Sequence, residues 1–405
     1  MKALSIAAAV AVAGTLAGGF GIAGIEPAAA QGAAGAVGIS GPPPSGRESA
    51  LPKTAPGRLP RADAAQFEEM ERVASPAPGG VPGLSSTMSN GKRTFKLDAT
   101  EAPEAFGSAK MPFTTSRVAV QVLGTSTSAA MTPVTSYPYR ATGKLWARFG
   151  SSWFVCTASL IGKGILVTAA HCIHNYGKKG PGFANAIEWD PATYSTTGRP
   201  YGRYSYRYAA IPTPYYNGTD TCTTRGVVCN NDIAVIVLWP VGGVMPGSRL
   251  GWYRYGWNGY SFVTSPVFGN RHMAQISQLG YPVSHDGGYQ MQRTDAAGVY
   301  YTSGNLKNTQ IGSAQTGGSS GGPWLVNLGT PPVVANNVSR GTSVLQAVVG
   351  VTSYQSTTYG YNRLGSSWFG QNVQYPSANY GGRGAGNIGY LVNYVCSQPA
   401  YSASC

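Results

Sequence analysis

The sequence predicts an all-β protein. Among its 405 residues are 56 Gly, 28 Pro and 25 Tyr, and only 11% of the chain is charged. A helical bundle would need many Ala, Glu, Lys and Leu residues at helical spacing, whereas this composition suits short strands joined by turns. The apolar content of 42% is sufficient for a sizeable core.

The first 30 residues are predicted to be a signal peptide. Lys2 is followed by an Ala-, Gly-, Val- and Leu-rich stretch and then by three alanines that end at Ala30. This order is typical of a secretory signal with a small-residue cleavage site. A membrane anchor is the alternative, but glycines dilute the stretch, and no other segment is long and apolar enough to span a bilayer. We therefore expect a secreted protein, extracellular or periplasmic, without a membrane span.

Residues 31–117 are predicted to be a pro-segment. They are rich in Pro and Gly, contain no Cys or Trp and show little apolar periodicity. Such a segment cannot bury much surface, so we expect it to be flexible or weakly folded and mostly irregular.

The composition changes at Val118. Every Trp, every Cys and all four His lie beyond it, together with only six of the 15 acidic residues and eighteen of the 29 basic ones. Residues 118–405 therefore carry a net charge of +12. Short apolar runs separated by Gly-, Asn- and Ser-rich turns lie at 159–170, 233–239, 344–354 and 388–395. They predict strands of a barrel or sandwich, except that the last suits a short terminal helix.

The six cysteines all lie in this second part, at positions Cys156, Cys172, Cys222, Cys229, Cys396 and Cys405. An even number in an exported chain indicates three disulfides, although spacing alone leaves the pairing open. A zinc site is the alternative. It is disfavoured because no Cys-x-x-Cys occurs and the nearest histidines, His171 and His174, flank only one cysteine.

A histidine follows the apolar run 165–167 in the sequence Thr168-Ala169-Ala170-His171-Cys172. Small alanines let the backbone pack tightly while the imidazole projects from the end of a strand. Histidine is the side chain best suited to accept a proton near neutral pH. A single histidine after a strand is more often structural, so His171 needs partners.

An aspartate, Asp232, directly precedes the apolar run 233–238. A carboxylate at the mouth of a buried strand must be paired or hydrogen-bonded. Of the six acidic residues beyond Val118, only Asp232 leads into such a run. The alternative is a loop residue that caps a turn.

A glycine-rich segment, 316–323, contains Ser319 and Ser320 in the order Gly-Gly-Ser-Ser-Gly-Gly-Pro. Glycines around a serine allow backbone N–H groups to converge on one point, as the stabilisation of an oxyanion requires. A flexible turn is the alternative.

Together the three motifs resemble those of the chymotrypsin-like (trypsin-like) serine peptidases, in which His, Asp and Ser follow in this order. The resemblance covers about residues 118–405 and is greatest to the secreted bacterial branch that includes glutamyl endopeptidases. It implies two six-stranded antiparallel Greek-key barrels with the active site between them, and a short C-terminal helix.

The resemblance also implies roles for individual residues. Ser320, which is followed by Gly-Gly-Pro, would be the nucleophile, His171 the general base and Asp232 the group that orients the imidazole. The backbone N–H groups of Gly318 and Ser320 would form the oxyanion hole. A disulfide between Cys156 and Cys172 matches one beside the family's histidine. That match favours neighbour pairing for the others, as Cys222–Cys229 and Cys396–Cys405.

Three positions depart from the family pattern. Ser319 stands where trypsin-like zymogens carry an aspartate, so we do not expect their ion-pair switch, although we expect a cut after Arg117 or nearer Val122. Ala314 replaces the aspartate of tryptic enzymes. Val351 stands near the place of the histidine of glutamyl endopeptidases. With Ser353 and Tyr354 forming one wall, we expect a neutral P1 residue, apolar or small.

The predicted function is therefore a secreted serine endopeptidase that acts on proteins or peptides as a monomer, without cofactor or metal. Segments 201–208 and 252–257 interleave aromatic residues with Arg, as surfaces that stack on sugars or single-stranded nucleic acid do. Alternating exposed strands explain them equally well, and we expect no specific nucleic-acid partner. The rival function is a catalytically silent protease-fold protein that binds an acidic partner or polymer.

Overall fold

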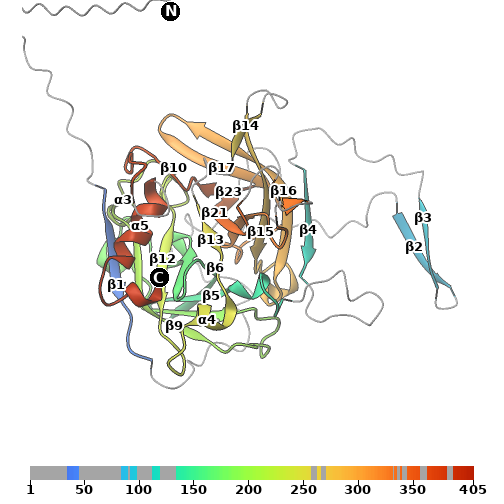
Figure 1. Cartoon of the computed structure of the whole chain (residues 1–405), viewed down its shortest axis with the longest axis horizontal. Coiled ribbons are helices and arrows are strands. Elements are labelled where there is room, and N and C mark those ends of the chain that lie inside the picture. Colours follow the sequence, from blue (N-terminus) through green and yellow to red (C-terminus); the bar gives the residue numbers. More distant parts are fainter. Residues whose placement is uncertain are drawn as a thin grey trace, which may run out of the picture. The chain divides into compact units, whose positions relative to one another are not determined.

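Strands form most of the regular structure in the computed structural model (Figure 1). The structure describes residues 34–44, 84–89, 92–97, 112–118, 134–256, 262–265, 271–331, 333–334, 338–339, 344–355, 363–380 and 386–405. The predicted signal peptide, 1–30, lies outside the described residues.

Six antiparallel strands close into a first barrel. They are β5 (Thr142–Phe149), β6 (Ser152–Leu160), β7 (Ile165–Thr168), β8 (Ala186–Pro191), β9 (Tyr204–Pro212) and β12 (Ala234–Leu238). The pairing runs β5, β6, β7, β12, β9, β8, and β8 pairs back with β5. The apolar side chains of β7 and β12, which are buried along their whole length, help to fill this barrel.

A second set of strands forms the other barrel. They are β15 (Arg271–Gly280), β16 (Gln292–Ser303), β17 (Leu306–Gly312), β18 (Pro323–Val326), β21 (Ala347–Val351), β22 (Tyr354–Gln355) and β23 (Arg363–Ser367). The strands β21 and β22 are two halves of one strand that is interrupted at Thr352 and Ser353. Because β21 pairs with β18 and β22 pairs with β23, this strand closes the ring.

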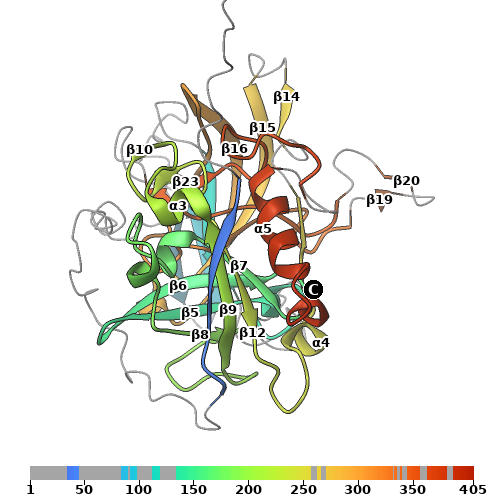
Figure 2. The same cartoon turned by 90° about the vertical axis from the view of Figure 1, so that its left-hand side faces the viewer.

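The two barrels share one topology. When the six strands of each are numbered along the chain, the order around the ring is 1-2-3-6-5-4 in both. The all-β prediction and the two six-stranded barrels are confirmed, as is the short C-terminal helix, which is α5 (Gly386–Cys396). Figure 2 shows α5 on the outer side of the first barrel.

The remaining elements are short. Strands outside the rings are β10 (Cys222–Thr224), β11 (Val228–Cys229), β13 (Arg254–Tyr255), β14 (Val263–Ser265), β19 (Val333–Val334) and β20 (Val338–Ser339). The short helices are α3 (Thr213–Asn217) and α4 (Pro246–Leu250). Single 3-10 turns occupy Tyr139–Ala141, Ala170–Cys172, Gly180–Gly182, Asp286–Gly288 and Ser402–Ser404.

The expected pro-segment contains more regular structure than its composition predicts. Its described parts form β1 (Ala36–Ser40), the hairpin of β2 (Leu84–Ser89) with β3 (Lys92–Leu97), and β4 (Phe113–Arg117). β1 pairs with β9 of the first barrel, and β4 pairs with β16 of the second. The edges of β9 and β16 offer unpaired backbone groups to which β1 and β4 bond, whereas β2 and β3 pair with each other.

Two apolar clusters stabilise the barrels. The larger one fills the first barrel and continues to Leu279, Leu325 and Val348 of the second. The smaller one, which includes Ile276 and Trp324, lies within the second barrel. Within the described part of the chain, no helix combines the length and the apolar character that crossing a bilayer requires.

Candidate active site

His171 lies in the 3-10 turn that follows β7. A disulfide between Cys156 of β6 and Cys172 ties this turn to the neighbouring strand. The backbone N–H of Cys172 donates to Ala169 O, and that of Ile173 donates to Ala170 O. The two small alanines are fully buried, so the turn packs tightly and fixes the position of the imidazole.

Asp232 is fully buried between β11 and β12 and holds His171 at two points. Its Oδ1 accepts a hydrogen bond from the His171 backbone N–H at 2.9 Å, and its Oδ2 lies 2.7 Å from His171 Nδ1. A carboxylate can only accept, so Nδ1 carries the ring proton and Nε2 of the neutral imidazole is left as the basic nitrogen.

Two further hydroxyls anchor Asp232. Ser353 Oγ donates to Asp232 Oδ2 at 2.5 Å, and the Asp232 backbone N–H donates to Ser367 Oγ at 3.0 Å. The oxygen Oδ2 thus accepts from both His171 Nδ1 and Ser353 Oγ, while Oδ1 accepts from the His171 backbone N–H. Such bonds fix the orientation of a buried carboxyl group.

A second buried carboxyl group, that of Asp220, holds the residue that precedes Asp232. Both oxygens of Asp220 accept bonds from Asn231, at 2.8 Å from its backbone N–H and at 2.7 Å from its Nδ2. Burial raises the pKa of Asp220 to about 7. Asn372 Nδ2 donates to Asn231 Oδ1 at 2.8 Å, so the residue before Asp232 is held from two elements.

The second histidine of the motif region, His174, has a structural environment. Its Nε2 lies 2.8 Å from Lys179 O, and its ring packs edge-on against Phe183. Burial lowers its pKa to about 4, so it stays neutral near pH 7.

The glycine-rich segment brings Ser320 to the same junction between the barrels. Thr157 N–H of β6 donates to Ser320 O at 2.7 Å, and Gly321 N–H donates to Thr352 O at 2.7 Å. Gly321 has φ +76°, and a Cβ there would lie 1.9 Å from Thr168 Oγ1. Ser320 therefore lies against the end of β7, the strand that leads to His171.

The neighbouring serine has a different environment. Ser319 Oγ donates to Thr316 O at 2.7 Å, inside its own turn, and the residue is fully buried. Its hydroxyl thus stabilises the loop.

Gly318 adopts φ +93°, a conformation that favours glycine, and its O accepts from Thr157 Oγ1 at 2.8 Å. A Cβ there would lie 2.5 Å from Tyr281 O. Among the residues that the structure describes, the backbone N–H groups of Gly318 and Ser320 donate to no protein acceptor. Both are therefore available to a bound group.

The expected wall residues occupy different environments. Ala314 is partly exposed, and its N–H donates to Thr115 Oγ1 of β4 at 3.2 Å. Val351 is fully buried in the large core cluster. Tyr354 is buried, and its ring lies over Gly365, where a Cβ would come within 2.0 Å of its Cζ. Ser353, which follows β21, bonds to Asp232 and so helps to position this carboxylate.

Thr352, next to Val351, carries the polar contact of this strand. Its Oγ1 accepts from Gln278 Nε2 at 2.7 Å and from Trp324 Nε1 at 3.1 Å. Sequence reasoning missed Thr157, Ser367 and Thr352, since each acts through a contact with a residue distant in the chain. A hydroxyl inside an apolar strand is the one signal that marks Thr157.

The three disulfides join Cys156 to Cys172, Cys222 to Cys229 and Cys396 to Cys405, the neighbour pairing that the resemblance implies. The described residues contain two groups of close Cys, His and Asp side chains, around Cys156 and around Cys222. Their sulfurs are joined in disulfides and so offer no thiolate to a metal.

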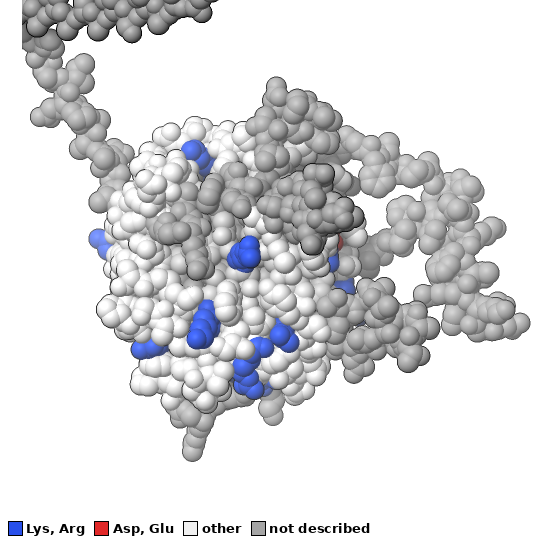
Figure 3. Space-filling view, in the orientation of Figure 1, with Lys and Arg blue, Asp and Glu red and all other residues white. Residues whose placement is uncertain are grey.

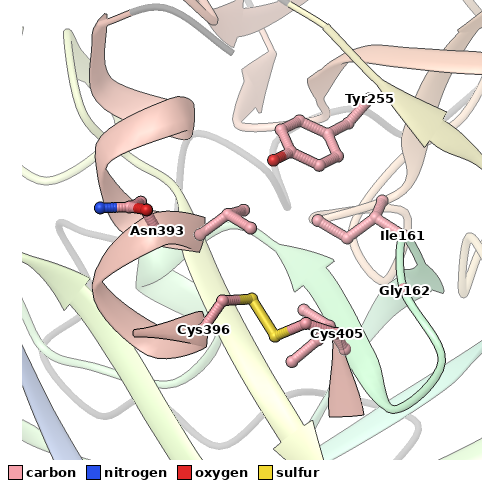
Figure 4. Close-up of a pocket in the computed structure, with 8 residues that line it drawn as sticks. Ile161, Gly162, Tyr255, Asn393, Cys396 and Cys405 are labelled. Carbon is pink, nitrogen blue, oxygen red and sulfur yellow. A yellow bond between two sulfur atoms is a disulfide. The ribbon is translucent and has the colours of Figure 1, made fainter. Parts of the chain in front are cut away.

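A separate pocket of about 250 Å³ lies between α5 and the turn before β7 (Figure 4). Its lining includes Ile161, Tyr255, Val392 and the Cys396–Cys405 disulfide. The lining contains no Asp, Glu, His or Ser side chain, so this pocket is no candidate for hydrolytic chemistry.

The double barrel, with a carboxylate, an imidazole and a serine loop at its junction, defines a chymotrypsin-like protease domain. Residues 131–366, more than half of the chain, match the Trypsin family model. The chain belongs to the trypsin family.

Individual relatives are more distant. The chain is 28% identical over 232 residues to the glutamyl endopeptidase of Bacillus licheniformis, covering 57% of this chain and 61% of that protein. It is 30% identical over 136 residues to an extracellular metalloprotease of Bacillus subtilis, covering 33% of this chain and 38% of that protein. The chain thus spans less than two thirds of the length of either relative. The crystal structure of the protease Anisep from Arthrobacter nicotinovorans is 18% identical, with a TM-score of 0.43, and the match covers 64% of this chain and 96% of that one.

Proposed function

We propose that this protein is a secreted serine endopeptidase that hydrolyses peptide bonds through an acyl-enzyme. The contact of Asp232 with both the backbone and Nδ1 of His171 carries the proposal. That contact orients a basic Nε2 at the junction of the barrels, where the Ser320 loop also lies. Membership of the trypsin family agrees with it.

In this mechanism His171 Nε2 removes the proton of Ser320 Oγ, and the oxygen attacks the carbonyl carbon of the substrate. The imidazolium is stabilised by Asp232, which stays ionised, and then gives its proton to the leaving amine. Water repeats the sequence on the acyl-enzyme, with His171 again acting as the base. The amides of Gly318 and Ser320 stabilise the oxyanion, a contribution of about 10²–10³ in rate for one donor.

A neutral P1 residue, apolar or small, is the proposed preference. Ala314 brings no counter-charge to the place where tryptic enzymes carry an aspartate, and the described groups around it are hydroxyls and amides. Ser313 Oγ, for example, donates to Gln278 Oε1 at 2.7 Å. A peptide library varied at P1 tests this, and strong selection for Arg or for Glu would refute it.

Labelling by a fluorophosphonate probe tests the catalytic assignment. We expect the protein to be labelled at Ser320 and the Ser320→Ala variant to lose both labelling and peptidase activity. The matched variant Ser319→Ala should keep both, since Ser319 Oγ is bonded inside its own turn. If correctly processed protein remains unlabelled, the silent, partner-binding alternative holds.

Maturation by removal of residues 1–30 and then by a cut between the pro-segment and the protease domain is also proposed. Arg117 is exposed and bonded to Asp286, and Val118 is buried with its N–H on Met291 O at 2.9 Å. The bond between Arg117 and Val118 thus lies at the end of the β4–β16 pairing, and a protease must first detach it. N-terminal sequencing of the secreted form locates the cut.

A further inference from the structure

The segment 34–44 is built into the first barrel as an added strand. Ala36–Ser40 pairs in antiparallel register with β9, from Ala36 opposite Pro212 to Ser40 opposite Tyr208 (Figure 2). Backbone bonds extend the pairing at both ends, from Gly41 N–H to Arg207 O at 2.8 Å and from Thr213 N–H to Gly35 O at 2.9 Å.

Two side chains of the barrel domain hold the backbone of this segment. Trp239 Nε1 donates to Pro42 O at 3.0 Å, and the Tyr375 hydroxyl donates to Gly35 O at 2.5 Å. The side chains of Ala36, Val37 and Ile39 pack against the large core cluster. The contacts therefore combine a backbone ladder, two anchors and apolar burial, which is how a docked strand is recognised in other proteins.

Gly38 gives the contact its sequence requirement. A Cβ at this position would lie 2.1 Å from the Tyr208 hydroxyl oxygen and 2.7 Å from Ala209 O. Because one of these atoms belongs to the backbone, a larger residue cannot be accommodated by a side-chain rotation alone. Ser40, on the same strand, is exposed and meets no such restriction.

The edge that β1 covers belongs to a strand that supports the candidate site. Among the described residues, β8 pairs with β9 only at Tyr204 and Ser205, so β1 is the partner of the stretch from Tyr208 to Pro212. On its other edge β9 pairs with β12, which begins two residues after Asp232. Loss of β1 would expose the edge of a barrel strand next to the one that follows Asp232.

We propose that the segment 34–44 remains bound as a noncovalent strand after the chain that joins it to the protease domain is cut, so that the mature enzyme consists of two chains. The proposal rests on the maturation proposed above but not on Ser320 or on the identity of the cutting protease.

The composition of the segment distinguishes a strand held by backbone hydrogen bonds from a fragment held by charge. Residues 34–44 contain no charged side chain, whereas the domain beyond Val118 is strongly basic. A strand held by backbone hydrogen bonds and apolar packing should stay bound at high salt, but a fragment held by charge should dissociate.

The test uses the full chain with Ser320→Ala, which removes self-digestion, and with the recognition sequence of a site-specific endopeptidase placed within residues 60–70, outside the described residues. After cutting, size-exclusion chromatography and mass spectrometry under non-denaturing conditions follow the two pieces. We expect them to stay together at 1:1, also in about 0.5 M NaCl.

Peptides then test the register without altering the protein. A fluorescent peptide of residues 34–44 should exchange with the bound piece of the cut chain. Binding should raise the fluorescence anisotropy of the peptide. Unlabelled peptide with Gly38→Val should compete at least about tenfold more weakly than the parent, and Ser40→Val about as well as it. Separation of the pieces, their dissociation by salt, or equal competition by both variants would overturn the proposal. Fluorophosphonate labelling of the processed wild type reports on the peptidase function independently.

Discussion

At the scale of single residues, the buried hydroxyl of Ser353 is the contact that most directly affects the candidate triad. Its Oγ is hydrogen-bonded to Asp232 Oδ2 at 2.5 Å and to the backbone O of Val227 at 2.6 Å, and the residue is completely buried. A hydrogen bond to a charged group contributes about 1.5–3 kcal/mol. We expect Ser353→Ala to lower kcat/KM by about 10- to 100-fold, because the carboxylate loses orientation.

The matched control for this prediction is Ser366→Ala. Ser366 is equally buried and bonds only to backbone groups, of Ser367 and Val351. Steady-state kinetics on one peptide substrate should show a clearly smaller loss for Ser366→Ala. Equal losses in the two variants would mean that general damage to the barrel, and not the bond to Asp232, causes the effect.

The burial of Lys144 predicts that the stability of the protein depends on pH. Its buried Nζ donates to Gly288 O at 2.8 Å and lies 4.6 Å from the ring of Trp146 and 4.1 Å from that of Tyr289. Burial lowers its pKa from 10.5 to about 7. Between these values the unfolded chain binds more protons than the folded one, so the free energy of unfolding rises with pH.

Lys144→Met should remove this rise. Urea unfolding between pH 7 and 10, in the Ser320→Ala background, measures the slope for both proteins. As the pH increases, the unfolding free energy of the parent should rise relative to that of Lys144→Met. Lys163→Met, at an exposed position, is the control and should keep the parent slope. An unchanged slope in Lys144→Met would contradict the prediction.

At the scale of elements, the loop before β12 depends on buried polar contacts. The Cys222–Cys229 disulfide closes the β10–β11 hairpin, and Asp220 binds both donors of Asn231. Asp220→Ala would remove the acceptor of the Asn231 backbone N–H and the shorter-bonded acceptor of its Nδ2, both buried. We expect the unfolding free energy to fall by about 3 kcal/mol and kcat/KM to fall with it, since Asn231 precedes Asp232.

Two further variants test this element. Asp220→Asn retains one acceptor oxygen, so it should recover part of both losses. Asp295→Ala removes a partly exposed carboxylate bonded to Arg293 and to Ser277 Oγ, and it should cost less than about 1 kcal/mol. If Asp220→Ala lowers stability no more than Asp295→Ala does, the loop does not depend on this contact.

At the scale of the whole molecule, the charge is distributed unevenly between surface and interior. Of the six acidic residues beyond Val118, four are buried: Glu188, Asp190, Asp220 and Asp232. The other two, Asp286 and Asp295, are paired with arginines. On the face seen in Figure 3, Lys and Arg side chains are spread over the described surface with almost no acidic ones among them.

This surface predicts salt-dependent turnover of acidic substrates. Two peptide substrates that carry either Glu or Gln at one position away from the scissile bond should differ in how kcat/KM depends on salt. We expect kcat/KM of the Glu peptide to fall several-fold more steeply between about 0.05 and 0.5 M NaCl, because screening weakens the attraction. Parallel profiles would show that the surface charge does not act on substrates.

The chain by itself determined the class of fold and the candidate residues. Turn-rich composition predicted strands, and the local motifs around His171, Asp232 and Ser320 are short enough to be found by inspection. The bonded pair of His171 and Asp232 was predictable from the resemblance, because both lie at the ends of strands that this topology pairs.

Only the tertiary structure decided the rest. Ser353 as a partner of Asp232 and Thr352 as a partner of Gly322 depend on contacts across 121 and 30 residues. The Gly-Gly-Pro sequence already favoured Ser320 over Ser319, and the structure added the bond of Ser319 inside its own turn. The strand at residues 36–40 shows the same limit. Its composition indicates irregular chain, and it becomes a strand because β9 offers an unpaired edge and Tyr208 leaves room only for Gly38.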